Sequence, residues 1–327
     1  MPVSEFDIIQ RYFAAAGSPR EDVVLGVGDD AALVRVPPDR ELAVAMDTLV
    51  DGVHFPRGTD PAAIGHKALA VNLSDLAAMG ADPAWATLAL TLPQPDTDWL
   101  EGFARGFSAL AQRFGVQLVG GDLTRGPLTV TVQAHGLVPA ERALRRDGAQ
   151  PGDRIYVTGT LGDAGLALRL LQEDVTVPAM HRDFLVARLE YPQPRVQAGR
   201  ALRGLASAAI DLSDGLLADL GHILERSDVG ATLWVDRLPR STAFRETLED
   251  RPGLEPEWDR LPLAAGDDYE LCFTVPPSGA AALQAALGGL DCGYLKVGTV
   301  EEGPGLRCLH DDGSPCVAGA AGYRHFG

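Results

Sequence analysis

Aspartates recur along the chain at the ends of apolar runs, next to glycine or serine. They are Asp29 and Asp30 in GVGDDAALV, Asp47 after ELAVAM, Asp75 in VNLSDLAAMG, Asp122 in LVGGD, Asp211 and Asp214 in AIDLSDG, and Asp267 and Asp268 in AAGDDYE. Crowded carboxylates repel one another unless a cation holds them together. Oxygen ligands without histidine or cysteine select Mg²⁺, and less often Mn²⁺ or Ca²⁺. Each aspartate alone is more typical of a turn or a helix N-cap than of a metal ligand, so the repetition is what indicates magnesium-dependent phosphate chemistry.

Positive groups that could hold a polyphosphate are few. The candidates are Arg125 in GGDLTRGP, Arg145 and Arg146 in a polar segment, and the backbone N–H groups of Gly120 and Gly121. Arginine presents a planar fork to phosphate oxygens, and consecutive glycines let a ligand approach the backbone closely. Composition alone favours the interpretation that Arg145 and Arg146 are solvated charges of a linker rather than phosphate contacts.

Several nucleotide and metal motifs are absent from the sequence. A Walker A loop is excluded because the only lysines are Lys67 in HKA and Lys296 in LKV. The segment GVGDDA matches the dinucleotide pattern G-x-G-x-x-A, but its two carboxylates would repel a pyrophosphate. The four cysteines show no Cys-x-x-Cys spacing, so zinc and thioredoxin-type chemistry are unsupported. There is no HExxH, and Ser213 lacks the G-x-S-x-G context of a serine nucleophile.

Length and charge narrow the class of protein further. The 327 residues predict about two domains, since domains average roughly 150 residues. The net charge of −17 repels nucleic acids and anionic membranes. The N-terminal MPVSEFDIIQRYF carries acidic residues where a signal peptide needs basic ones, and no run of about 18 apolar residues occurs. We therefore expect a cytoplasmic protein with reduced thiols and no membrane or nucleic-acid partner.

The elements that would position the aspartates follow from hydrophobic patterning. Strands are predicted at residues 41–46, 85–92, 116–119, 128–138, 154–158 and 270–275. Helices are predicted at residues 62–79 and 98–113. This alternation indicates an α/β or α+β fold, in which carboxylates at the carboxyl ends of strands converge on one cleft.

Gly, Pro and charged residues mark the organisation of the chain. The polar stretch at 139–153 predicts a boundary between a domain at 1–140 and one at 150–327. A Gly-rich turn from Gly159 to Gly165 is predicted to open a helix. The segment 236–260, rich in Arg, Glu and Pro, is interpreted as a surface excursion.

Seven segments in order resemble the thiamine-monophosphate kinase family. They are GVGDDAAL, MDTLVDGVHF, KALAVNLSDLAAMGADP, VGGDLTRGPL, GDRIYVTGTLGDAG, AIDLSDGLLADLGHI and GDDYELCFTV. The resemblance runs from about residue 5 to the terminal GYRHF. AVNLSDLAAMGA and IDLSDGL alone point only to the wider aminoimidazole-ribonucleotide-synthetase-like superfamily, whereas MDTLVDGVHF and DDYELCF favour the kinase.

The resemblance implies a two-domain synthetase-like architecture, with a homodimer formed through the N-terminal sheet and a C-terminal domain that closes over the nucleotide. It implies that ATP phosphorylates thiamine monophosphate to thiamine diphosphate, the last step of thiamine diphosphate biosynthesis, with several Mg²⁺ ions. The implied metal ligands are Asp30, Asp47, Asp75, Asp122, Asp211 and Asp214. The implied ATP contacts are Gly121, Asp122, Arg146 and Ser213, and the implied substrate contacts are His54, Asp267 and Tyr323. It implies no general base.

The chain departs from the family pattern at two places. Asp267 stands where glutamate is common, which shortens a substrate-facing carboxylate by one methylene. Ala45 and Met46 stand beside Asp47 where hydroxyl residues are common, so a metal contact there must come from a backbone carbonyl or water. Trp85 or Tyr323 could stack on a ring of the substrate. Two alternatives stay open: another ATP-dependent enzyme of the superfamily, and a divalent-cation-binding protein without turnover.

Overall fold

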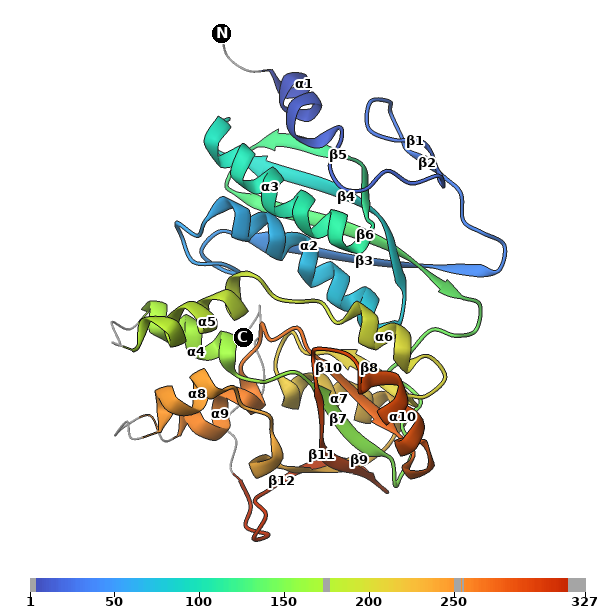
Figure 1. The fold of residues 1–327 in the computed structure, drawn as a ribbon, viewed down its shortest axis with the longest axis vertical. Helices are drawn as coiled ribbons and strands as arrows, with labels where there is room; N and C mark the ends of the chain where they lie inside the picture. Colours follow the sequence, from blue (N-terminus) through green and yellow to red (C-terminus); the bar gives the residue numbers. More distant parts are fainter. Residues whose placement is uncertain (1–3, 173–176, 250–253, 255, 317–327) are drawn as a thin grey trace. The chain divides into compact units, whose positions relative to one another are not determined.

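The computed structural model describes residues 4–316, apart from 173–176, 250–253 and 255. The chain forms two compact units, the first of residues 1–76 and 81–141 and the second of residues 77–80 and 142–327. The first unit contains a four-stranded sheet and the second a six-stranded sheet, each accompanied by helices (Figure 1). This layering of helices and sheets confirms the predicted fold class.

The four-stranded sheet of the first unit has the order β3 (Arg40–Val50), β6 (Thr129–Pro139), β4 (Asp82–Leu92) and β5 (Gln117–Arg125). Strand β6 runs antiparallel to both neighbours, whereas β4 and β5 are parallel. Along β6, Val130, Val132 and Ala134 are fully buried and alternate with half-buried residues. The sheet therefore covers a core on one side, as the alternation in the sequence predicts.

Helices α2 (Pro61–Ala78) and α3 (Thr97–Phe114) lie against one face of this sheet (Figure 1). The Asp96 side chain caps α3 by accepting hydrogen bonds from the backbone of its first turn, and Gly115 ends the helix in the left-handed conformation. Phe103 and Phe107 of α3 are 0% exposed, and burying such side chains contributes about 1.5–3 kcal/mol each. Both helices match the predicted ranges to within about two residues.

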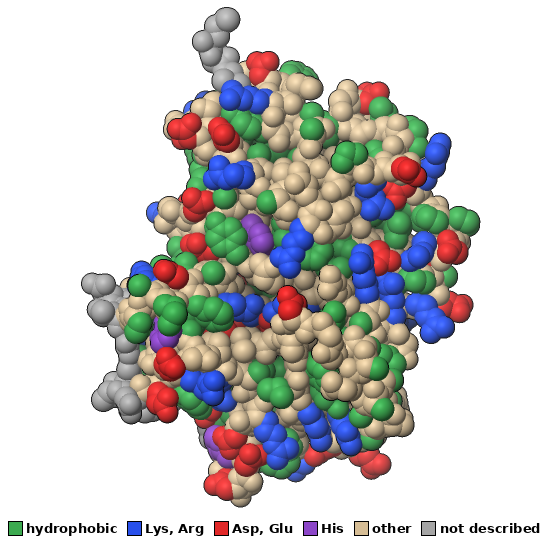
Figure 2. All heavy atoms as spheres, viewed as in Figure 1, with side chains coloured by type: hydrophobic (Ala, Val, Ile, Leu, Met, Phe, Trp, Pro, Cys, Tyr) green, Lys and Arg blue, Asp and Glu red, His purple; other side chains and the backbone are tan. Residues whose placement is uncertain are grey.

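The N-terminal segment begins with α1 (Glu5–Ile8) and a π-helical turn, η1 (Ile9–Phe13). It continues into an antiparallel pair, β1 (Val23–Leu25) and β2 (Leu33–Val34). Asp22 ties this segment to β4, because it accepts hydrogen bonds from Arg20 at 2.6 Å and from the Trp85 indole at 3.0 Å. Acidic and basic side chains are mixed over the face seen in Figure 2, so the net negative charge forms no single block there.

The six-stranded sheet of the second unit is almost entirely antiparallel. Its order is β12 (Gly305–Leu309), β9 (Gly230–Trp234), β11 (Tyr294–Glu301), β7 (Arg154–Thr158), β10 (Leu271–Val275) and β8 (Ala208–Asp211). The pairing of β12 with β9 is parallel and the other pairings are antiparallel. The core under this sheet includes Ile155, Val157 and Cys272, and helix α7 (Leu216–Ser227) packs Leu220 and Ile223 against it.

Four further helices of this unit form a second apolar cluster. Its helices are α4 (Asp163–Gln172), α5 (Ala179–Glu190), α8 (Thr242–Leu248) and α9 (Glu257–Ala264). Phe244 of α8 is 0% exposed and Leu261 of α9 is 2% exposed. The interpretation of residues 236–260 as a surface excursion is therefore wrong for its helices at 242–248 and 257–260, whose apolar side chains are buried; residues 250–253 and 255 lie outside the described residues. Shorter elements are α6 (Val196–Leu202), α10 (Ala280–Leu287), η2 (Val235–Arg237) and η3 (Pro277–Gly279).

All six predicted strands are present, although most extend beyond the predicted ranges. The Gly-rich turn at 159–162 does precede a helix, α4. None of the helices in the described part of the chain combines the length and apolar character that a bilayer crossing needs.

Candidate functional site

A pocket of about 550 Å³ in the first unit is lined by two of the predicted metal ligands. Asp30 lies in the loop between β1 and β2, and Asp122 lies in β5, 92 positions later. Gly120 and Gly121 line the same pocket beside them. Both carboxylates are exposed to solvent. The fold therefore brings an acidic loop and a Gly-rich strand together around one cavity.

Gly121 is required by the neighbouring strand. A Cβ atom on Gly121 would lie 1.9 Å from the backbone oxygen of Leu88 in β4, a separation no side chain tolerates. A Cβ atom on Gly120 would meet nothing within 4 Å. The Cβ direction of Gly121 is thus filled by the backbone of Leu88, whereas that of Gly120 is open; both glycines line the pocket, and Gly121 is the more exposed of the two.

Asp47 and Asp75 form a second carboxylate pair in the first unit. Asp47 lies on the face of β3 that also carries the buried Leu49, and Asp75 lies in helix α2. The two carboxyl groups are close enough to hydrogen-bond, and burial raises the pKa of Asp47. Two half-buried carboxyls in contact must share a proton or a cation, since two anions at that distance repel each other strongly.

His54 follows β3 and is held by its neighbours. Its Nδ1 accepts a hydrogen bond from the backbone N–H of Val50 at 3.0 Å. Its backbone oxygen accepts a hydrogen bond at 3.2 Å from the ammonium group of Lys67, whose residue is 3% exposed. Sequence reasoning did not select Lys67. The available signal was a single lysine within the otherwise apolar run KALAVNL, where a charge needs a partner.

Three aspartates meet at the start of α7 in the second unit. Asp211 ends β8, Asp214 follows in the turn, and Asp219 lies in the first turns of the helix. Asp219 Oδ2 accepts a hydrogen bond from the Asp214 backbone N–H at 3.1 Å. Burial, together with the charge of Asp211, raises the pKa of Asp219 to about 7. Asp219 was also missed from the sequence, where its spacing of five from Asp214 in DGLLADL resembles ordinary helix polarity.

The segment that contains Asp267 is built against Ser213. The backbone N–H of Asp267 donates to the Ser213 oxygen at 2.9 Å, and the N–H of Tyr269 donates to the Leu212 oxygen at 2.9 Å. Asp267 and Tyr269 have φ angles of 68° and 48°, in the left-handed region that non-glycine residues avoid. Such conformations cost about 1 kcal/mol or more each and persist where surrounding contacts hold them.

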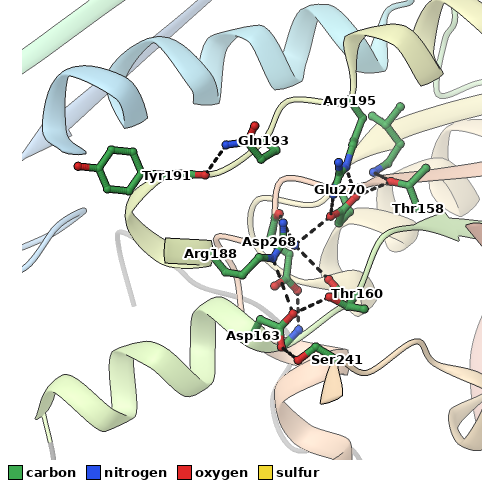
Figure 3. Close-up of polar contacts among 12 residues, drawn as sticks. Thr158, Thr160, Asp163, Arg188, Tyr191, Gln193, Arg195, Ser241, Asp268 and Glu270 are labelled. Carbon is green, nitrogen blue, oxygen red and sulfur yellow. Dashed lines mark hydrogen bonds and ion pairs between the residues drawn. The ribbon is translucent and has the colours of Figure 1, made fainter. Parts of the chain in front are cut away.

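A buried polar network surrounds Glu270, which follows this segment directly (Figure 3). Glu270 is 0% exposed and accepts a two-point hydrogen bond from Arg195, at 2.6 and 2.5 Å. It also accepts hydrogen bonds from Arg188 at 2.9 Å and from the Thr158 hydroxyl at 2.7 Å. Gly159 leaves the space for this carboxylate, because a Cβ there would lie 2.1 Å from a Glu270 oxygen. Arg188 and Arg195 thus share the Glu270 carboxylate, and Arg188 Nε also lies 3.7 Å from Asp163 Oδ2.

Asp163 and Asp268 complete the network. Asp163 accepts hydrogen bonds from Thr160 at 2.5 Å and from Ser241 at 2.6 Å, and burial raises its pKa. Asp268 accepts a hydrogen bond from the Gly162 N–H at 2.8 Å, and burial raises its pKa well above the usual range. The start of α4 is thus occupied by a protein carboxyl group. Within the DDYE segment, Asp267 lies next to Ser213, whereas Asp268 and Glu270 are buried in the network.

Other predicted residues lie in separate places. Arg145 forms an exposed ion pair with Asp147 at 2.6 Å. Arg146 is exposed, and its backbone oxygen accepts a hydrogen bond from Ser227 at 3.0 Å. Trp85 is 1% exposed and belongs to the core of the first unit, so the stacking role considered for it is wrong. Tyr323 lies outside the described residues.

The expectation that the aspartates cluster at the carboxyl ends of strands is only partly right. Asp211 does end β8, but Asp47 and Asp122 lie within strands and Asp75 lies in a helix. The reason is that the sheets are mostly antiparallel, so strand ends of both kinds share each edge. Side-chain alternation and the adjacent helix, rather than strand ends, bring Asp47 and Asp75 together.

Two family models match the chain. The N-terminal domain of AIR synthase related proteins matches residues 28–138, and the C-terminal domain matches residues 150–311. The thiamine-monophosphate kinase of Escherichia coli K12 is 50% identical over 327 residues, which cover 100% of this chain and 99% of that protein. The corresponding kinase of Haemophilus influenzae Rd is 40% identical over 329 residues, with the same coverage.

Solved structures give the same result. The crystal structure of thiamine-monophosphate kinase from Stenotrophomonas maltophilia K279a superposes with a TM-score of 0.84 at 48% identity, covering 91% of this chain and 93% of that one. AaThiL complexed with AMPPCP and TMP superposes with a TM-score of 0.77 at 32% identity, covering 92% of each chain. The chain belongs to the thiamine-monophosphate kinase family and has its two AIR-synthase-related domains.

Proposed function

We propose that the protein transfers the γ-phosphoryl group of ATP to thiamine monophosphate and releases thiamine diphosphate and ADP. The observation that supports this most directly is the meeting of carboxyl groups from distant segments, as with Asp47 and Asp75, in a chain 50% identical to a thiamine-monophosphate kinase. Acidic clusters without a P-loop suit a kinase that neutralises phosphate charge with metal ions. The same relatives favour this reaction over another superfamily reaction or a cation store without turnover.

The carboxylates fit Mg²⁺ as their resident ion. The carboxyl groups of Asp47 and Asp75 are in contact, burial raises the pKa of Asp47, and burial together with the charge of Asp211 raises the pKa of Asp219 to about 7. These donor sets consist of oxygen alone, which is the ligand chemistry of Mg²⁺. We propose that the residues which hold the ions are Asp30, Asp47, Asp75, Asp122, Asp211 and Asp214, with Asp219 positioning the last two. Bound Mg²⁺ supplies charge neutralisation for the transferring phosphoryl group.

The protein residues have binding and orienting roles in this proposal. The phosphate of the acceptor has a second pKa near about 6, so its attacking oxygen is already ionised at neutral pH and needs no general base. Catalysis then consists of in-line positioning and electrostatic stabilisation. We assign the ATP contacts to Gly121, Asp122, Arg146 and Ser213; the exposed Gly121 lines the pocket beside Asp122.

His54, Asp267 and Tyr323 are the proposed contacts to thiamine monophosphate. Lys67 would fix the loop that carries His54, since its ammonium group binds the His54 backbone oxygen. The buried Glu270 network would fix Asp267 beside Ser213. The shorter aspartate at 267 makes this backbone support important, because a short side chain has less freedom to adjust its reach.

Product analysis tests the reaction. Purified protein is mixed with ATP, thiamine monophosphate and Mg²⁺, with parallel reactions that contain EDTA or free thiamine. We expect thiamine diphosphate and ADP in equal amounts, only with metal and only from the monophosphate. Stoichiometric ADP without thiamine diphosphate would favour another ATP-dependent reaction of the superfamily. Cation binding that ATP leaves unchanged, with no ADP formed, would favour the non-catalytic alternative.

We also propose that the protein is a cytoplasmic homodimer whose subunits meet through the sheet of the first unit. Leu42, Val44 and Met46 alternate along the edge strand β3 and are 43%, 52% and 62% exposed. The Thr48 and Thr131 hydroxyls hydrogen-bond at 2.8 Å, so the even-numbered residues of β3 lie on the same face of the sheet as the odd-numbered residues of β6. Leu42, Val44 and Met46 therefore lie on this face. An exposed apolar row on an edge strand favours association with a second copy.

Light scattering after size-exclusion chromatography tests the dimer. We expect a mass of twice 34.6 kDa for the wild type and a shift towards the monomer for Met46→Asp. Met180→Asp, at an exposed methionine of the second unit, is the matched control and should leave the mass unchanged. A monomeric wild type, or a dimer that resists Met46→Asp, would contradict the proposed interface.

A further inference from the structure

Three side chains of zinc-ligand type meet in the second unit, among residues that have no part in the proposed kinase site. Asp259 belongs to α9, His310 follows β12, and Cys316 is six positions further on. Their potential ligand atoms, a carboxylate oxygen, an imidazole nitrogen and a thiol sulfur, all lie within 4.8 Å of one another. The absence of a Cys-x-x-Cys spacing hides this cluster in the sequence, because α9 and the C-terminal hairpin are about 50 residues apart.

Both nitrogen and oxygen donors of the cluster are oriented by another group. His310 Nδ1 lies 3.0 Å from Asp236 Oδ1, which leaves Nε2 to face Asp259 Oδ2 at 4.0 Å. The other oxygen of Asp259 accepts a hydrogen bond from Arg240 at 2.9 Å. A carboxylate behind the far nitrogen of a histidine is the arrangement that fixes the tautomer of metal-binding imidazoles.

A tight hairpin places the thiol. Cys316 N donates to the Cys308 oxygen at 2.9 Å, His310 N donates to the Ser314 oxygen at 2.9 Å, and Leu309 pairs with Pro315 between them. Because side chains alternate along a strand, His310 and Cys308 point to the same face of the hairpin, and Cys316 lies opposite Cys308. A second sulfur is therefore next to the three-residue cluster.

The charges around the cluster suit a divalent cation. Asp236, Asp259 and a Cys316 thiolate carry three negative charges, and Arg240 carries one positive charge. A bound divalent ion would leave this group neutral. A nucleophilic Cys-His-Asp arrangement is disfavoured, because burial and the two carboxylates raise the pKa of Cys316, whereas reactive thiols have a lowered pKa.

We propose that Asp259, His310 and Cys316 bind one zinc-type divalent cation that fastens the C-terminal hairpin to α9. Mixed sulfur, nitrogen and oxygen donors select Zn²⁺ over Mg²⁺. In a tetrahedral zinc site the donors lie roughly 3.3–3.8 Å apart, so these partly exposed side chains must move inwards by up to about 1 Å. Three protein donors leave a fourth position for water or for Cys308.

Cobalt spectroscopy tests this proposal independently of the kinase reaction. Metal-free, reduced full-length protein is titrated with Co²⁺, and the near-ultraviolet charge-transfer band that only thiolate–cobalt bonds give is recorded. We expect one equivalent of Co²⁺ to produce the band and Zn²⁺ to abolish it. Carboxylate sites that also bind Co²⁺ do not contribute, because they contain no sulfur.

Variants assign the ligands. Cys316→Ser should remove the band, and His310→Gln and Asp259→Asn should weaken Zn²⁺ binding at least about tenfold. Cys292→Ser is the matched control and should keep the band, and kinase turnover with Mg²⁺ should be unchanged in Cys316→Ser. A reduced wild type without the band overturns the proposal. So does a band that survives Cys316→Ser but disappears in Cys308→Ser.

Discussion

Replacing Glu270 by glutamine removes the carboxylate that two buried arginines share, while Arg188 keeps its ion pair with Asp163 at 3.7 Å. The side chains of Arg188 and Arg195 are only 12% and 15% exposed, so water replaces little of the lost interaction. Removing one partner of a buried ion pair costs about 3–5 kcal/mol. The glutamine must also turn an N–H₂ group towards an arginine donor or towards Thr158, which leaves at least one of the four present hydrogen bonds unmade. We therefore expect a loss of about 3–5 kcal/mol in the free energy of unfolding of the second unit.

Hydrogen exchange read by mass spectrometry measures this loss where it arises. Peptides from β7 and β10 should exchange faster in Glu270→Gln, whereas peptides from β6 in the other unit should not. Urea unfolding gives the magnitude. The matched control is Asp147→Asn, which removes the exposed ion pair with Arg145 and should leave the unfolding midpoint unchanged because solvent screens that pair.

A double-mutant cycle separates the buried charge from the shape of the side chain. Combining Glu270→Gln with Arg195→Met also removes one of the two arginine charges that lose Glu270, so the double variant should be less destabilised than the sum of the single variants. A loss below about 1 kcal/mol for Glu270→Gln, or strict additivity in the cycle, would refute the argument that the network is held by paired charge.

Four further substitutions test separate parts of the structure. Asp75→Asn should lower turnover more than about a hundredfold. The metal-free variant should keep or gain thermal stability, because the like-charge contact with Asp47 is relieved. Near wild-type activity would remove Asp75 from the metal site. Gly121→Ala should destabilise the first unit by about 1–3 kcal/mol or more in urea unfolding, whereas Gly120→Ala, with nothing within 4 Å, should be tolerated. Lys67→Met should raise the KM for thiamine monophosphate more than the KM for ATP, and equal changes would contradict its link to the substrate loop. Burial raises the pKa of Asp268, so the folded protein keeps the proton on this carboxyl to higher pH than the unfolded chain does. As the pH rises above about 4, the wild type should therefore lose stability relative to Asp268→Asn in urea unfolding. Parallel pH profiles of the two proteins would show that Asp268 is not held protonated.

The strands and the two long helices were predictable because their signals are local. The alternation along 128–138 and the spacing of Phe103 and Phe107 each follow from neighbouring residues, and both predictions are confirmed. The interpretation of residues 236–260 as a surface excursion failed because charged residues outnumber apolar ones in this segment. Its few apolar side chains, such as Phe244, are nevertheless the ones that the second cluster buries. Composition reports the average of a segment, whereas packing uses only one face of it.

The site was predictable in its chemistry and less so in its arrangement. Acidic residue types pointed to oxygen-ligated cations, but the contact of Asp47 with Asp75 depends on which face of β3 lies under α2. Asp219 and Glu270 owe their environments to burial and to partners far along the chain, with Glu270 112 residues from Thr158. No local pattern carries that information, because such pairings exist only once the sheet has formed.

The strand order of the two sheets also sets when each can form during synthesis. The first sheet is complete once β6 is made, since every strand of that sheet precedes residue 140. Strand β7 instead pairs with β10 and β11, and Thr158 meets Glu270 only 112 residues later. At about 5–20 residues per second, a ribosome takes roughly 6–20 s to make that stretch. During this interval the apolar β7 has neither neighbour, and Arg188 and Arg195 lack Glu270, the acid that they share in the folded unit. We therefore expect the nascent second unit to be more exposed to aggregation than the first unit, whose sheet can already be complete.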